Sequence, residues 1–114
     1  MDMQRPVDLR GGSAGGLLMN CLFLKDMVTG AEQHWWCGPV SSLQEPCFIP
    51  RHKTAAEGDG WIIQLCNRLD EHRTDLLIFD ALDIEKGPIA TINVPVRMRF
   101  GLHGNWADAD TIGL

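Results

Sequence analysis

"WIIQLCNRLDEHRTDLLIFDA", residues 61–81, is the stretch that decides the fold. It consists of two apolar runs, Trp61–Asn67 and Leu76–Ala81, separated by a charged turn. Strands that are apolar at nearly every position are normally buried on both faces. The stretch therefore predicts two antiparallel strands that need neighbouring layers on both sides. No segment of the chain shows a helical period of about 3.6 over ten residues or more.

Further strands flank this pair on both sides in the sequence. "CFIPR" at 47–51 precedes the pair and "IATINVPV" at 89–96 follows it, which gives four strands in succession. Residues 17–37 predict a β-hairpin whose turn contains Gly30. The remaining segments are expected to be an N-terminal glycine-rich loop or approach segment at 1–16, a loop at 38–46 and a C-terminal tail at 107–114.

The spacing of the strands indicates a propeller. Two similar units, each an apolar strand, an Asp, a Gly and a second strand, begin about 55 residues apart, and blades that repeat at roughly 40–50 residues are typical of propellers. The predicted fold class is all-β, with antiparallel sheets that form about one and a half blades. Because a closed propeller needs at least about four blades, the 114 residues are expected to be part of a larger structure.

The composition excludes several classes of function. The apolar fraction of 45% and the charged fraction of 22% are ordinary for a globular chain, and the net charge of -5 argues against a nucleic-acid surface. No apolar run approaches the ~20 residues of a membrane-spanning helix, and the N-terminal residues lack the apolar segment of a signal peptide. The four cysteines form no C-x-x-C pair and are interpreted as reduced, buried side chains of a cytoplasmic protein.

The histidines are the first candidates for chemistry, and they are His34, His52, His72 and His103. No pair has the i, i+2 or i, i+4 spacing of a local metal site, so the first three are interpreted as surface or loop residues. His103 differs because it stands in "FGLHGNW" between Gly101 and Gly104, which are expected to let the chain turn sharply and the ring approach closely. Two interpretations of His103 stay open: a satisfied core histidine, or a metal ligand whose partner ligands lie outside these residues.

Glu45 is the second candidate, in the segment "LQEPCF" at the beginning of an apolar strand. A carboxylate that enters a protein interior needs a partner, because burying it alone costs several kcal/mol. In one interpretation Glu45 binds backbone amides at the end of a loop. In the other it orients a metal-bound imidazole through the free N–H of the ring.

Four motifs in order then carry a family resemblance: "QEPCFIPR", "EGDGWIIQL", "DLLIFDALDIEKGPIATINVPVR" and "FGLHGNW". Together they resemble the C-terminal end of the carotenoid cleavage oxygenases. "HWWCGP" and "CNRLDEHRTDLLIFDALDI" are similar to the lignostilbene dioxygenase branch in particular. The resemblance runs from about residue 10 to residue 106 and covers about the last quarter of a full family member. Residues 1–114 are thus expected to be the C-terminal part of the oxygenase propeller.

The resemblance implies a seven-bladed β-propeller with a non-haem Fe(II) held by four histidines, three of them hydrogen-bonded to glutamates. Such enzymes use O2 to cleave an alkene into two carbonyl products. By motif, His103 matches the fourth iron ligand, and Glu45 matches one of the orienting glutamates. The other three histidines lie upstream in the family, so Glu45 is expected to orient a histidine that is absent from this chain.

Two classes of function remain at this point. The first is a segment of an alkene-cleaving dioxygenase that is inert alone. The second is a non-catalytic binding or interaction module that keeps the β fold. In either class, exposed strand edges would favour self-association.

Overall fold

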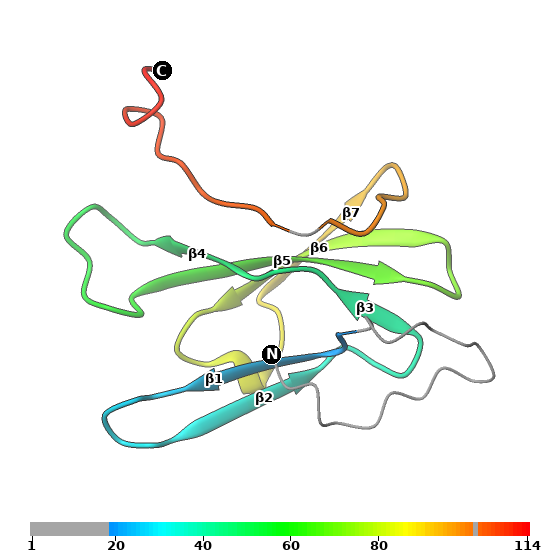
Figure 1. Ribbon diagram of the computed structural model, residues 1–114, viewed down its shortest axis with the longest axis horizontal. Helices are drawn as coiled ribbons and strands as arrows, with labels where there is room; N and C mark the ends of the chain where they lie inside the picture. Colours follow the sequence, from blue (N-terminus) through cyan, green and yellow to red (C-terminus); the bar gives the residue numbers. More distant parts are fainter. Residues whose placement is uncertain (1–18, 102) are drawn as a thin grey trace.

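The computed structural model describes residues 19–101 and 103–114 (Figure 1). In these residues the chain forms seven strands and a single 3-10 turn, η1, at Ile84–Lys86. The strands are β1 Cys21–Lys25, β2 Glu32–Trp36, β3 Ser41–Leu43, β4 Cys47–Pro50, β5 Gly60–Arg68, β6 Arg73–Asp80 and β7 Ala90–Val94. Every strand pairing is antiparallel, which confirms the predicted all-β class.

The larger sheet is built on the two apolar runs of the deciding stretch. β5 and β6 pair from Trp61 opposite Asp80 to Arg68 opposite Arg73. β4 lies on the other side of β5 and β7 on the other side of β6, so the order β4–β5–β6–β7 is the predicted four-stranded blade. Residues 1–18, which include the whole of the predicted loop or approach segment at 1–16, lie outside the described residues.

The segment 38–46 corrects one prediction, because it is not entirely a loop. Ser41–Leu43 forms β3, which pairs with β5 from Ser41 opposite Arg68 to Leu43 opposite Cys66. All three residues of β3 are buried. "SSL" has no apolar run to signal a strand; its pairing depends on the long neighbouring strand β5, which a local pattern does not show.

A β-bulge separates β3 from β4 along the same edge of β5. The Gln44 N–H still donates to the Leu65 carbonyl at 2.9 Å, and pairing resumes with Cys47 opposite Ile63. Glu45 and Pro46 therefore lie opposite the single residue Gln64. Proline supplies no N–H to a ladder, and bulges of this kind redirect side chains at the edges of sheets.

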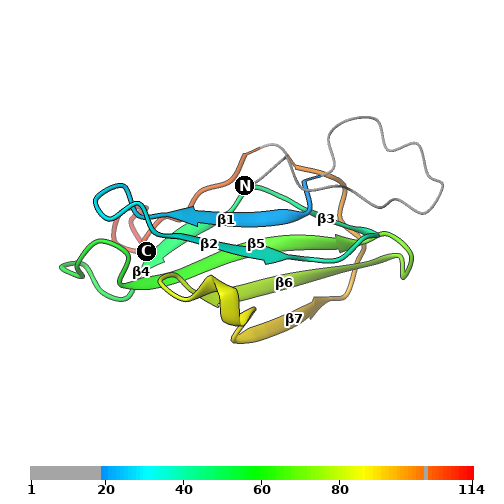
Figure 2. The same ribbon diagram turned by 90° about the horizontal axis from the view of Figure 1, so that it is seen from below.

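The smaller sheet is the predicted hairpin, with Cys21 of β1 opposite Trp36 of β2. It lies over one face of the larger sheet (Figure 2). Trp35 packs edge-on against Phe79 of β6, with ring centroids 5.1 Å apart. The Leu43 N–H donates to the Met19 carbonyl at 2.6 Å and joins the two sheets. The predicted four-stranded blade and half of another account for six of the seven described strands, and β3 is the seventh.

The two faces of the β5–β6 pair differ in burial. Leu77 and Phe79 are fully buried in the core beneath the small sheet. Leu76 and Ile78, which alternate with them, are only half-buried. Among the described residues, the second face thus lacks a complete covering layer, as the two-faced apolar pattern predicted. In the described residues, no helix is long and apolar enough to cross a membrane.

Candidate metal-ligand site

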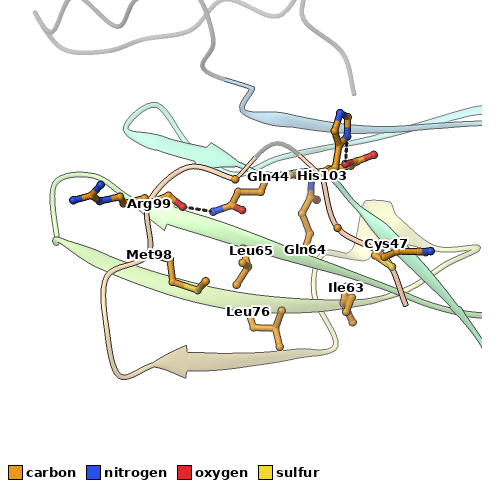
Figure 3. A pocket seen from close by; sticks show the side chains of 13 residues that line it. Gln44, Cys47, Ile63, Gln64, Leu65, Leu76, Met98, Arg99 and His103 are labelled. Atoms are coloured by element: carbon orange, nitrogen blue, oxygen red, sulfur yellow. Dashed lines mark hydrogen bonds and ion pairs between the residues drawn. The ribbon is translucent and has the colours of Figure 1, made fainter. Parts of the chain in front are cut away.

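His103 and Glu45 are in contact, and Figure 3 marks the interaction of the His103 ring with a dashed line. His103 Nδ1 lies 2.8 Å from Glu45 Oε2, although the two residues are 58 positions apart in the sequence. Glu45 comes from the bulge between β3 and β4, and His103 from the irregular segment that follows β7. The fold therefore joins the two candidates that the sequence offered separately.

This contact corrects the expectation that Glu45 serves a histidine outside the chain. Its nearest imidazole is that of His103, from the same chain. The interpretation of His103 as a packed core residue is also wrong, because its side chain is 87% exposed. Apolar and glycine neighbours suggested an inward ring, but residues 95–101 and 103–107 run along the open face of the sheet and leave the ring outside.

The direction of the hydrogen bond between His103 and Glu45 determines which ring nitrogen remains free to bind a metal. An ionised carboxylate only accepts hydrogen bonds, so Nδ1 of His103 must carry the proton that Glu45 receives. In the neutral ring, Nε2 then carries the free lone pair. A carboxylate on one ring nitrogen and a metal on the other is the usual arrangement of protein-bound zinc and iron histidines. The pair therefore fits one ligand of a metal centre.

The glycines beside His103 act differently from the prediction. Neither Gly101 nor Gly104 has a positive φ. A Cβ at Gly101 would lie 2.8 Å from Gln44 Oε1, so this glycine admits the side chain of Gln44. A Cβ at Gly104 would meet nothing within 4 Å, and we find no structural requirement for glycine there.

A groove of about 420 Å³ lies beside the His103–Glu45 pair. Its floor is apolar and is formed by Ile63 and Leu65 of β5, Leu76 of β6 and Met98. Gln44 and Gln64 contribute amides close to the pair. Sequence reasoning missed both glutamines, although a glutamine in the middle of the apolar run "WIIQLCN" was a visible signal.

The described residues supply an incomplete set of ligands. Within 19–101 and 103–114, no three His, Cys, Asp or Glu side chains gather in a way that could hold a metal. The other histidines have different surroundings: His34 stacks on Phe23 with ring centroids 5.0 Å apart, and His52 Nδ1 lies 3.3 Å from the Thr54 hydroxyl. His103 is therefore a single donor that needs further ligands to retain a metal.

Comparison with known proteins shows which family the chain belongs to. The family described as retinal pigment epithelial membrane protein, the carotenoid oxygenases, matches residues 6–108. The chain belongs to this family. The carotenoid oxygenases include lignostilbene-alpha,beta-dioxygenase isozyme III of Sphingomonas paucimobilis, which is 47% identical over 98% of this chain and 23% of its own length.

Solved structures of carotenoid oxygenases share the fold. The lignostilbene dioxygenase of Pseudomonas brassicacearum superposes with a TM-score of 0.83 and 40% identity, over 93% of this chain and 22% of that one. The cobalt-substituted apocarotenoid oxygenase (ACO) of Synechocystis gives a TM-score of 0.74 and 36% identity, over 79% of this chain and 19% of that one. The chain thus spans less than a quarter of the carotenoid oxygenases that it matches.

Proposed function

We propose that this chain is the C-terminal part, residues 1–114, of a carotenoid oxygenase propeller and supplies one iron ligand, His103, with its orienting carboxylate, Glu45. The observation that carries the proposal is the 2.8 Å contact between Nδ1 and Oε2, which leaves Nε2 free. The 47% identity to a lignostilbene dioxygenase supports oxidative cleavage of an alkene by the complete protein. The isolated chain is inactive in this proposal, because one imidazole does not retain a metal.

The residues of the chain have distinct roles in this proposal. Fe(II), a metal for which imidazole ligands are well suited, would bring O2 and the alkene together so that the double bond is cleaved to two carbonyl products. Glu45 holds a proton on Nδ1 and fixes the plane of the His103 ring. His103 presents Nε2 as a neutral donor, so the metal keeps its positive charge.

The groove suggests where an apolar substrate would lie. Its floor of Ile63, Leu65, Leu76 and Met98 offers apolar surface directly beside the His103–Glu45 pair. An aromatic alkene such as a lignostilbene would bury its rings there and keep the double bond on the metal side. We further propose a cytoplasmic location, in agreement with Cys37, Cys47 and Cys66, which remain thiols and form no disulfide.

Metal content tests this proposal directly. In the complete oxygenase that contains this chain, His103→Ala should abolish iron retention and cleavage, because removal of one ligand opens the coordination set. His52→Ala is the matched control and should keep one iron per chain. Thermal unfolding of the iron-free parent and of both iron-free variants should coincide, since each variant removes one exposed side chain.

Two results would contradict the proposal. If the His103→Ala variant keeps stoichiometric iron, His103 is not a ligand. That result would favour the alternative, a non-catalytic interaction module. If the 114-residue chain with Fe(II) and O2 releases aldehyde from a stilbene above the free-iron background, the chain is a complete catalyst and the assignment as one part of a ligand set fails.

A further inference from the structure

Gln64 is an unusual residue for its place in the fold. It stands in the middle of β5 between Ile63 and Leu65, and it is 1% exposed. Its Nε2 donates to the Gln44 backbone carbonyl at 2.5 Å, whereas its Oε1 has no partner among the described residues. A buried amide with one unpaired acceptor destabilises a core relative to an apolar side chain of the same shape. The position of Gln64 therefore calls for a reason other than stability.

Gln44 continues the chain of contacts toward His103. Its backbone carbonyl accepts from Gln64 one residue before Glu45, so the bulge is held at that point. Its side-chain Nε2 donates to the Arg99 carbonyl at 3.2 Å (Figure 3). Its Oε1 lies against Gly101, two residues before His103. One glutamine thus contacts both the segment that carries Glu45 and the segment that carries His103.

The His103–Glu45 contact needs such support. Both side chains are exposed, His103 by 87% and Glu45 by 44%, and a contact between exposed polar side chains contributes little to holding a segment in place. Residues 95–107 contain no strand or helix among those described. In the part nearest His103, the described anchors to the sheet are the Met98 N–H bond to the Thr74 hydroxyl at 2.9 Å and the contacts of Gln44.

We propose that Gln64 and Gln44 are positioning residues that keep the imidazole of His103 on Glu45. Gln64 fixes the backbone of the bulge, and Gln44 transfers that fixed position to residues 99–101. Loss of either amide would let the two segments separate while the sheet stays intact. The inference rests on the proposed function in one respect only, namely that the positioned ring of His103 serves as a metal ligand.

The tautomer of the His103 ring tests the inference without a metal. Nitrogen NMR of the 114-residue chain with 15N-labelled histidine, about two pH units above the ordinary imidazole pKa of about 6.5, measures the ratio of Nδ1–H to Nε2–H forms. The parent chain should show mainly Nδ1–H. Gln64→Met and Gln44→Met, which keep side-chain length and remove the donor, should each lower this ratio several-fold, and Glu45→Ala should lower it further.

Gln33→Met is the matched control. Gln33 donates to the Leu82 carbonyl at 2.8 Å and accepts from the Glu85 N–H, so this variant loses comparable bonds far from His103. It should keep the parent ratio. The inference is overturned if both Gln64→Met and Gln44→Met keep the parent ratio while Glu45→Ala lowers it, and also if Gln33→Met lowers it equally. If Glu45→Ala leaves the ratio unchanged, the His103–Glu45 contact is absent and the proposed function fails as well.

Discussion

Glu45 reaches His103 because of the residue that follows it. Pro46 has no N–H to offer β5, and the bulge places Glu45 and Pro46 opposite the single residue Gln64. The extra residue changes the direction in which the strand presents its side chains, so the carboxylate lies at the open face rather than in the core. The bulge that contains Pro46 thus sets the position of the carboxylate that orients the ring.

We expect Glu45→Gln to weaken metal binding in the complete oxygenase. An amide accepts the Nδ1–H bond less strongly than a carboxylate and can also turn its NH2 toward the ring. Loss of such an orienting carboxylate lowers metal affinity by about 10–100-fold. Competition with a chelator of known affinity measures the change. The exposed Glu57→Gln is the control, and an equal affinity in both variants would argue against a role for Glu45.

Among the elements, β4 leaves no room for a side chain at Gly60 of β5. A Cβ there would lie 2.1 Å from the Ile49 carbonyl oxygen and 2.9 Å from Pro50 Cα, which are backbone atoms that cannot move aside. Gly60→Ala should therefore separate the two strands and lower the free energy of unfolding by about 1–3 kcal/mol. Urea denaturation measures the loss. Gly104→Ala meets nothing within 4 Å and should be neutral; similar losses in both would rule out the steric cause.

The β5–β6 pair carries an ionic cluster at its other end. The side chain of Asp75 is 3% exposed, with Arg68 Nε at 3.2 Å and Arg73 Nε at 3.0 Å. Burial opposes ionisation of Asp75, but hydrogen bonds from Arg73 and Arg68 outweigh it and hold the pKa of this carboxyl below 3.8. The folded state thus favours the ionised form of Asp75 more strongly than the unfolded chain does. This stabilisation is complete above about pH 4 and is lost as the pH falls through the folded pKa.

Asp75→Asn should accordingly remove on the order of 2 kcal/mol at neutral pH, the contribution of hydrogen bonds to a charged group. Below about pH 4 the variant should lose less stability with acid than the parent does, because it lacks the titrating group. Urea unfolding at a series of pH values gives both quantities. The exposed Asp70→Asn should follow the parent curve, and an acid slope that is unchanged in Asp75→Asn would show that Asp75 is not responsible.

For the whole molecule, the larger sheet has an open edge. β7 pairs with β6 on one side, and the described residues place no strand on its other side. Ile92 on this strand is 50% exposed, and Ile89 just before it is 59% exposed. Unpaired apolar edges recruit strands from other molecules. The unpaired edge of β7 and the half-covered face of the β5–β6 pair are both expected of a blade that packs against other blades.

We therefore expect the isolated chain to self-associate. Sedimentation velocity should show species larger than a monomer, and Ile92→Lys should shift the distribution toward the monomer because a charge on an edge strand opposes pairing. Val28→Lys, in the β1–β2 turn where Val28 is 95% exposed, adds the same charge away from the edge and should change little. A single sharp monomer peak for the parent chain at high concentration would refute the expectation.

The sequence by itself determined six of the seven described strands and the family. Apolar runs such as Trp61–Asn67 form strands wherever a sheet is available, and "QEPCFIPR" and "FGLHGNW" identify the carotenoid oxygenase family because they are local patterns. Only the tertiary structure decided that Glu45 faces His103, that Gln44 bridges their segments, and that Ser41–Leu43 is a strand. The physical reason is that these contacts join residues tens of positions apart through a bulge and an irregular segment. No periodicity or spacing encodes such pairings, since they follow from how β5 and its neighbours pack.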